Sequence, residues 1–159
     1  MTQRYTELLD AARAYCALIE QVDDGNQQIL PKLLELLPRL HASIAAFNIS
    51  RGDGCHVMEA DLDARFELFS RLHQLIGERD SYWLEYDVLT DEECKSGSLA
   101  DDLTDIYCEL KNGLLSLEEN IKDPDQAVDS WRCGYKVHWG KHLVDAEKHL
   151  YDLQSRNQL

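Results

Sequence analysis

The sequence predicts an all-α fold, a single-domain bundle of about five helices with a C-terminal antiparallel helix hairpin. Apolar residues recur at three- and four-residue steps through most of the chain, which is the period of amphipathic helices. Capping residues and glycines stand at several ends of these segments. The length of 159 residues is typical of one domain, so we expect residues 1–159 to share one core.

Two helices are predicted at the N-terminal end of the chain. The first covers about residues 2–22, where apolar side chains repeat with helical spacing. The second covers about 27–47 and is so rich in leucine that we expect it to be the most buried helix. Pro31 suits its first turn, whereas Pro38 removes an interior hydrogen bond and should kink or split the helix.

The middle of the chain contains one more predicted helix and an irregular arm. After a loop at 48–59, the third helix runs from about 61 to 76, with Leu62 and Phe66 among its inward-facing residues. The helical pattern lapses over about 78–97, which predicts an irregular arm with at most a short strand and no sheet. Three aromatic residues of this arm could line a pocket, although packing is their commoner role: Tyr82, Trp83 and Tyr86.

The last two predicted helices form the hairpin. Ser98 is a suitable cap for a helix over about 99–119. Pro124 suits the first turn of a second helix, which continues to about residue 153. Because only a few residues separate the two helices, they should pack antiparallel.

The composition is strongly acidic and excludes several classes of partner. Thirty acidic and 16 basic residues give a formal net charge of −14. This balance lacks the basic footprint of proteins that bind nucleic acids or anionic membranes. No apolar run approaches the roughly 20 residues that span a bilayer, and the first residues do not form a signal peptide. We therefore expect a soluble cytoplasmic protein with no nucleic-acid or membrane partner.

The five cysteines agree with a cytoplasmic setting. They are odd in number and widely spaced, and they include no C-x-x-C pair that could begin a zinc site. We expect reduced thiols that mostly behave as small buried apolar residues.

Two lines of polar side chains on the hairpin are candidates for a functional site. Asp102, Asp105 and Glu109 follow one flank of their helix at steps of three and four residues. His138 and His142 stand one turn apart on the last helix, a spacing that lets two imidazoles reach one metal ion. If the two lines face each other, these five residues could form a mixed nitrogen and oxygen site for Mg²⁺ or Mn²⁺.

A structural role for the same region is the preferred alternative. Arg132 is predicted on the core face of the last helix, where it needs an anionic partner, and Asp102 or Asp105 is the natural candidate. In this interpretation a buried network fixes the register of the hairpin and binds no metal. The residues of this binding or structural network are Asp102, Asp105, Glu109, Trp131, Arg132, Tyr135, His138, Trp139 and His142.

The C-terminal half resembles a known family. Residues 98–107 read S-L-A-D-D-L-T-D-I-Y, residues 131–132 read W-R, and residues 138–142 read H-W-G-K-H. Over about residues 80–151 the chain resembles a family of small bacterial proteins that is catalogued only as a domain of unknown function. The resemblance implies a compact all-α fold and a bacterial cytoplasmic setting, and it implies no activity or cofactor.

A looser similarity, to all-α nucleotide pyrophosphohydrolases, rests only on carboxylates presented from helices. That family joins an E-x-x-E pair to a later E-x-x-D pair, and here no clear second pair follows Asp102 and Asp105. We do not transfer the activity.

Two functional hypotheses follow from the sequence. The leading one is a non-enzymatic helical module that binds an unknown protein or small molecule and uses no cofactor, because no catalytic motif is present. The alternative is a metal-dependent hydrolase that uses Mg²⁺ or Mn²⁺ between the last two helices. Its candidate ligands are Asp102, Asp105, Glu109, His138 and His142.

Overall fold

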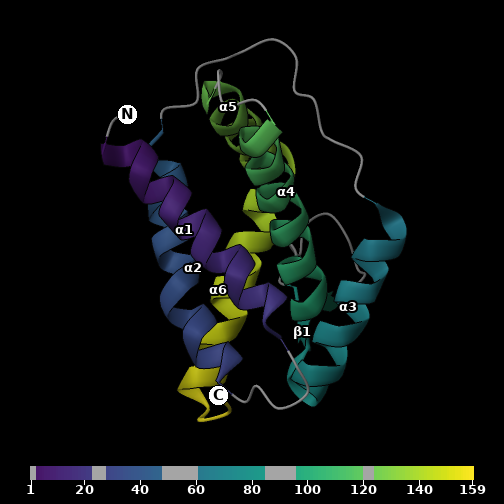
Figure 1. The fold of residues 1–159 in the computed structure, drawn as a ribbon. Helices are drawn as coiled ribbons and strands as arrows, with labels where there is room; N and C mark the ends of the chain where they lie inside the picture. The colour runs from purple at the N-terminus through teal and green to yellow at the C-terminus, as the bar shows by residue number, and fades with distance from the viewer. Residues whose placement is uncertain (1–2, 23–27, 48–60, 85–95, 120–123) are drawn as a thin grey trace, which may run out of the picture.

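A computed structural model describes residues 3–22, 28–47, 61–84, 96–119 and 124–159 (Figure 1). The all-α prediction is confirmed, because helices make up nearly all of the regular structure in these ranges. The α-helices are α1 (Gln3–Glu20), α2 (Ile29–Ala45), α3 (Leu62–Ile76), α4 (Leu99–Glu119), α5 (Pro124–Gly134) and α6 (Gly140–Ser155). None of them combines the length and apolar character that a bilayer crossing requires.

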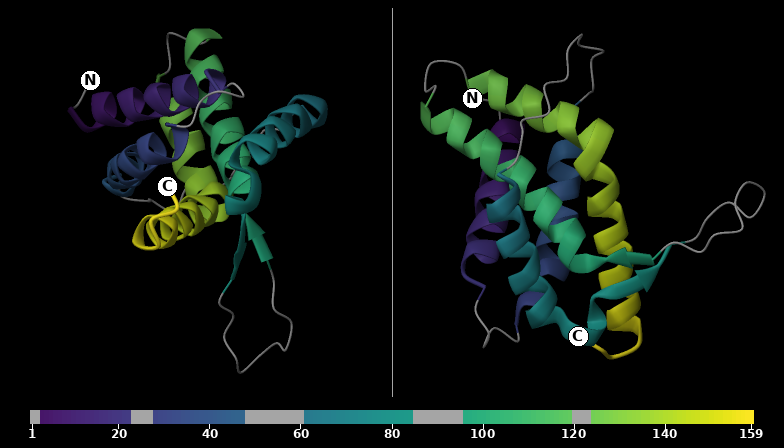
Figure 2. Two further views of the ribbon diagram at one scale, coloured as in Figure 1. Left: turned by 90° about the horizontal axis from the view of Figure 1, so that it is seen from below. Right: turned by 90° about the vertical axis from the view of Figure 1, so that its right-hand side faces the viewer.

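Four helices pack in a ring, and α3 is added on the outside. Helix α1 packs on α2, α2 on α6, α6 on α4, and α4 again on α1. Helix α3 lies apart from this ring and packs against α4 (Figure 2). The leucine-rich helix α2 contributes seven buried residues to the core, as its composition predicts. Helix α4 therefore has neighbours on several sides, which makes it the helix best placed to carry a site between α3 and α6.

The exposed position of α3 overturns one prediction. Leu62 and Phe66 were expected to face inward, yet they are 77% and 66% exposed. Because α4 is the main helical neighbour of α3, only one narrow stripe of α3 can be buried. That stripe consists of Leu68, Leu72 and Ile76.

Pro38 lies inside α2 without splitting it. The helix is continuous from Ile29 to Ala45 and contains Pro38 in its interior. The buried residues Leu36, Leu37 and Leu40 hold this part of α2 in the core, so packing outweighs the lost hydrogen bond.

The last predicted helix is present with a π-helical turn in its middle. Helices α5 and α6 are joined by η2 (Tyr135–Trp139), so the helical run continues from Pro124 to Ser155. It packs against α4 as the predicted hairpin. A Cβ at Gly140 would collide with the carbonyl oxygen of Tyr135, so the absence of a side chain there permits the turn. The extra residue of the π-helical turn changes the helical phase of the residues after it relative to those before it. Trp131, which lies before the turn and was expected at the edge of the core, is only 1% exposed.

The arm forms a small sheet, which the sequence analysis excluded. A short 3₁₀ turn, η1 (Gly77–Arg79), leads into β1 (Ser81–Trp83), which pairs antiparallel with β2 (Ser96–Ser98). The strands project from the bundle beside α6 (Figure 2). A Cβ at Gly97 would collide with the Tyr82 ring, so the glycine lets that ring lie across the neighbouring strand. Tyr86 lies outside the described residues.

The described cysteines differ in state. Cys16 and Cys108 are free, and burial raises the pKa of the Cys16 thiol to about 12, as expected for an inert core thiol. Cys133 is disulfide-bonded, so the expectation of reduced thiols is wrong for that residue. Cys55 and Cys94 lie outside the described residues.

A buried carboxylate, Asp80, joins α3, β2 and α4. Its Oδ1 accepts a hydrogen bond from the Ala100 amide at 2.7 Å, in the first turn of α4. Its Oδ2 accepts from the Ser98 hydroxyl at 2.8 Å and lies 2.9 Å from Nδ1 of His73. Ser98 in turn accepts from the Asp101 amide, as the predicted cap should. Asp80 is 1% exposed and satisfies backbone donors that the start of α4 would leave unpaired.

We expect the substitution Asp80→Ala to destabilise the protein by about 3 kcal/mol, because it leaves a buried amide and a partly buried hydroxyl without their acceptor. The free energy of unfolding in urea measures this loss. Asp10→Ala, at an exposed position on α1, is the matched control and should change it by less than about 0.5 kcal/mol. Equal effects of the two substitutions would contradict this role of Asp80.

Candidate functional site

The five residues predicted for a metal site converge between α4 and the last helical run. Asp102, Asp105 and Glu109 lie on the flank of α4 that faces His138 of η2 and His142 of α6. The carboxylate spacing follows the helix surface, and the antiparallel hairpin places the imidazoles opposite to it. The sequence predicted the two lines separately and gave their facing each other as the condition for the metal-site alternative.

Each imidazole is held by a carboxylate through its Nδ1 atom. His142 Nδ1 donates to Asp102 Oδ1 at 2.8 Å, and His138 Nδ1 donates to Glu109 Oε1 at 3.1 Å. The Nε2 atoms of both rings then point to one oxygen, Asp105 Oδ2, at 3.3 Å for His142 and 3.8 Å for His138. The two rings meet edge to face, with their centroids 5.1 Å apart. One carboxylate oxygen thus faces two imidazole nitrogens.

Asp105 is oriented by an arginine from a third helix. Its Oδ1 accepts from Arg65 Nε at 2.8 Å and from Nη2 at 2.7 Å, while Nη2 also reaches Asp101 at 2.8 Å. Asp105 is 7% exposed, so this pairing takes place at the base of the cluster. Because Arg65 occupies only Oδ1, Oδ2 stays directed to the histidines.

The expected role of Arg132 is wrong. Its Nη1 donates to Asp129 Oδ1 at 2.9 Å, one turn away on its own helix, whereas Asp102 pairs with His142 and Asp105 pairs with Arg65. Arg65 takes the place that was assigned to Arg132. No spacing in the sequence links Arg65 to α4, since the contact depends on how α3 packs.

Tyr82 is a second contributor that the sequence analysis did not place here. Its hydroxyl donates a short hydrogen bond to Asp102 Oδ2, and its ring stacks on His149 of α6 with centroids 4.7 Å apart. Asp102 therefore binds His142 with one oxygen and Tyr82 with the other. The aromatic character of the arm suggested a pocket wall, but it did not identify this partner.

Burial and hydrogen bonding shift three ionisation equilibria in the cluster. Burial raises the pKa of the Asp102 carboxyl, although the bonds from His142 and Tyr82 oppose this by favouring the carboxylate. The hydrogen bond to Asp102 raises the pKa of the His142 imidazole, against the effect of burial. Burial, followed by the bond to Asp102, raises the pKa of the Tyr82 hydroxyl.

The remaining residues of the predicted network have structural contacts. Trp139 Nε1 donates to the carbonyl of Trp131 at 3.1 Å, and Trp131 Nε1 donates to the Glu109 carbonyl at 3.2 Å. The Tyr135 hydroxyl lies 2.9 Å from His41 Nε2, on the other side of the last helix. These residues hold the hairpin together next to the cluster and do not enter it.

Asp105, His138 and His142 have the composition and spacing of a metal site. One ligand atom from each residue lies within 4.8 Å of the others. Ligands about 2.0–2.1 Å from a tetrahedral ion are about 3.3 Å apart, which is close to the observed spacing of Asp105 Oδ2 and His142 Nε2. His138 Nε2 lies 3.8 Å from the same oxygen, somewhat farther than this spacing, and its side chain is 42% exposed.

Comparison with known protein families places the chain in one of them. The model of the family DUF5063, a domain of unknown function, matches residues 1–156. The chain belongs to the DUF5063 family. The crystal structure of protein BF1032 from Bacteroides fragilis is similar, with a TM-score of 0.74 and 18% sequence identity, covering 96% of this chain and 92% of that one. No curated protein matches the chain.

Membership in DUF5063 confirms the family resemblance drawn from the C-terminal motifs and extends it to the N-terminal half. At 18% identity, the likeness to BF1032 supports the fold alone. The function therefore has to be argued from the side chains of the cluster.

The raised pKa of His142 makes a part of the stability depend on pH. In the unfolded chain a histidine titrates near about 6.5, so the contribution of His142 is fully present below that pH and is lost as the pH rises through the higher folded pKa. We expect wild type to exceed His142→Gln in free energy of unfolding at pH 6, and this difference to shrink by pH 9. Urea denaturation in the presence of a chelator measures it.

Asp102→Asn supplies the control, because Asp102 is the main cause of the raised pKa of His142. In that background, His142→Gln should show a weaker dependence on pH. A difference between wild type and His142→Gln that stays constant from pH 6 to pH 9 would refute the assignment.

Proposed function

We propose that this protein is a metal-binding module, with His138, His142 and Asp105 as ligands of one divalent transition-metal ion. The observation that carries the proposal is the convergence of two Nε2 atoms on one oxygen, Asp105 Oδ2. The opposite nitrogen of each ring is held by a carboxylate, which is the usual arrangement around metal-ligating histidines. Such bonds fix the tautomer that leaves Nε2 available to a metal.

The donor set favours particular metals. Imidazole nitrogen suits Zn²⁺, Fe²⁺, Co²⁺ and Mn²⁺, whereas Mg²⁺ prefers oxygen ligands alone. Of the two cofactors considered from the sequence, Mn²⁺ is thus favoured over Mg²⁺. Three protein ligands leave at least one coordination position for water or another small ligand.

This proposal combines the two hypotheses from the sequence. It keeps the leading one, a ligand-binding module, and gives the ligand a chemical identity. It takes its residues from the metal-dependent alternative, but it assigns no hydrolysis. The competing interpretation is a charged network in which a protonated His142 bridges Asp102 and Asp105 without a metal.

A metal titration distinguishes the two. We expect Zn²⁺, Co²⁺ or Mn²⁺ to raise the unfolding temperature of chelator-treated protein saturably, since a ligand at 100 times its Kd adds about 2.7 kcal/mol. Mg²⁺ should have a much smaller effect. His138→Gln and Asp105→Asn should abolish the shift, and the absorption spectrum of bound Co²⁺ reports the ligands directly.

His41→Gln is the matched control, because His41 also bonds a carboxylate, Glu147, but lies outside the cluster. Its metal-induced shift should equal that of wild type. No saturable shift with any of the four ions, or an equal loss in all three variants, would rule out the proposed site.

The carboxylates behind the histidines should tune metal affinity. Glu109→Ala removes the acceptor that orients His138, and we expect metal affinity to fall about 10–100-fold. Glu109→Gln keeps an acceptor oxygen and should lose less. Calorimetric titration with Zn²⁺ gives the affinities, and Glu118→Gln, near the far end of α4, is the control. Unchanged affinity in Glu109→Ala would show that Glu109 does not support a metal ligand.

A further inference from the structure

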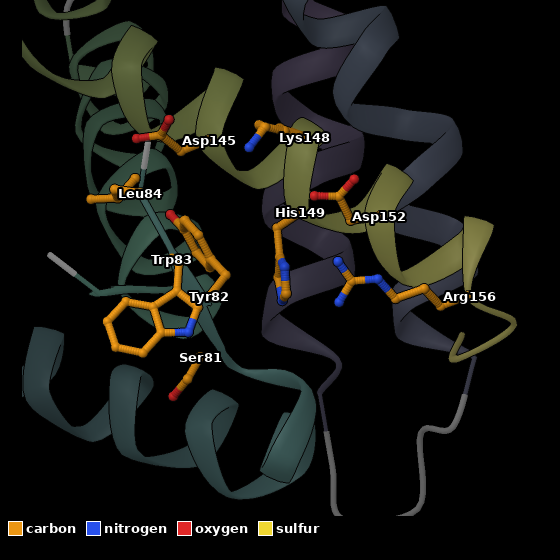
Figure 3. A pocket seen from close by; sticks show the side chains of 9 residues that line it. All are labelled: Ser81, Tyr82, Trp83, Leu84, Asp145, Lys148, His149, Asp152 and Arg156. Atoms are coloured by element: carbon orange, nitrogen blue, oxygen red, sulfur yellow. The ribbon is translucent and has the colours of Figure 1, made fainter. Parts of the chain in front are cut away.

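A groove separate from the histidine cluster lies between β1 and α6 (Figure 3). Its cavity volume is about 610 Å³, and its walls come from Ser81 to Leu84 and from the α6 side between Asp145 and Arg156. Strand β2 does not line it. The groove therefore borders the edge of β1 opposite to β2, where no other strand pairs with β1 among the residues that the structure describes.

This edge of β1 presents backbone groups. The register of the sheet places Asp80 opposite Leu99, just before the first paired residues, Ser81 and Ser98. The Leu99 amide donates to the Asp80 carbonyl at 2.9 Å, so Asp80 and Leu99 form a hydrogen-bonded pair. Hydrogen-bonded and non-hydrogen-bonded pairs alternate along an antiparallel ladder, so Tyr82 and Gly97 form the next hydrogen-bonded pair. The amides and carbonyls of Ser81 and Trp83 consequently point away from β2, toward the open edge. An open edge of this kind is a template for a further strand.

The α6 wall carries charges that are available to a ligand. Asp152 and Arg156 both line the groove, and their side chains are drawn at its right-hand side (Figure 3). Neither side chain forms an ion pair within the described ranges of the chain, although they stand one turn apart. Their separation along the helix axis is about 6 Å, close to the roughly 6.6 Å between side chains on one face of a strand.

The floor and one wall of the groove are aromatic. The Tyr82 ring stacks on His149, and His149 Nε2 donates to the Arg79 carbonyl at 2.6 Å, which fixes the imidazole in place. Trp83 is 71% exposed on the opposite face of the strand. Exposed aromatic rings next to polar groups are typical of binding surfaces.

We propose that the groove binds an extended peptide, which adds as a strand to the open edge of β1 and places oppositely charged side chains against Asp152 and Arg156. Main-chain hydrogen bonds to Ser81 and Trp83 would supply affinity, and the two charges would supply sequence preference. The Tyr82 side chain contacts α6, so the face of the sheet that carries Tyr82 is the face toward α6. Every second side chain of the added strand would lie on that face. The proposal does not depend on metal binding.

The probe is the pentapeptide acetyl-Val-Lys-Val-Glu-Val-amide, titrated into the full chain with and without chelator. Trp131 and Trp139 are buried, so a change in tryptophan fluorescence that disappears in Trp83→Phe reports on the groove. We expect saturable binding that is unaffected by the chelator. Peptides with two lysines or two glutamates at the charged positions should bind more weakly, because one of their charges is repelled.

Backbone methylation tests strand addition directly. Only alternate amides of an added strand point toward β1. We compare one peptide methylated at the amides of residues 2 and 4 with a second peptide methylated at the amides of residues 1, 3 and 5. One of these two patterns should weaken binding on the order of tenfold, and the other should have little effect. Equal effects of both patterns would overturn the strand geometry.

Charge reversal tests the α6 wall. We expect Arg156→Glu and Asp152→Lys each to weaken the mixed-charge peptide about fivefold, since an attraction becomes a repulsion. Lys32→Glu, exposed on α2, is the matched control and should bind as wild type does. No fluorescence response to any of the peptides at millimolar concentration, or a response that persists in Trp83→Phe, would refute the proposal.

Discussion

The candidate site depends on how Asp105 divides its two carboxylate oxygens. Oδ1 is occupied by the Arg65 guanidinium, and Oδ2 faces the Nε2 atoms of His138 and His142. Asp105 is almost fully buried, so its negative charge requires a partner in the folded protein. One side chain thereby joins α3, α4 and the last helical run. Removal of Arg65 would change the position of the Asp105 carboxylate that faces His138 and His142, so Arg65 acts on these histidines through Asp105.

The π-helical turn sets the relation between the core and the cluster. Before it, Trp131 is buried against α4, and after it, His142 faces the carboxylates. An uninterrupted helix would place both on one line, because they are close to three turns apart. Gly134 adds a second constraint, since a Cβ there would lie 2.8 Å from Glu109 Oε2, beside the bond to His138. The π-helical turn and the neighbouring glycine make room for a buried tryptophan and for a partly exposed imidazole about three turns further along the same helical run. Such turns occur frequently at functional sites.

Sequence periodicity predicted what one helix or one hairpin determines. The carboxylate line on α4 and the histidine pair one turn apart follow from helical geometry, and a short connection makes their helices antiparallel. Arg65 and Tyr82 enter the cluster from segments whose position depends on tertiary packing, and no local spacing encodes that. The same limit explains the wrong orientation of Leu62 and Phe66. The hydrophobic period identifies an apolar face, but it does not tell whether a neighbouring helix covers all of it.

Strand β1 connects the two candidate sites through Tyr82. The Tyr82 ring rests on His149 at the floor of the groove, and its hydroxyl is bonded to Asp102, which holds His142. A displacement of β1 would therefore change the environment of the carboxylate that orients a proposed metal ligand. Gly97 preserves this contact, because any side chain there would displace the Tyr82 ring. Metal affinity and peptide affinity influence each other by the same factor only where binding in the groove moves Tyr82. A strand that adds at the open edge of β1 leaves the Tyr82 ring on His149, so we expect the two sites to act independently on one scaffold.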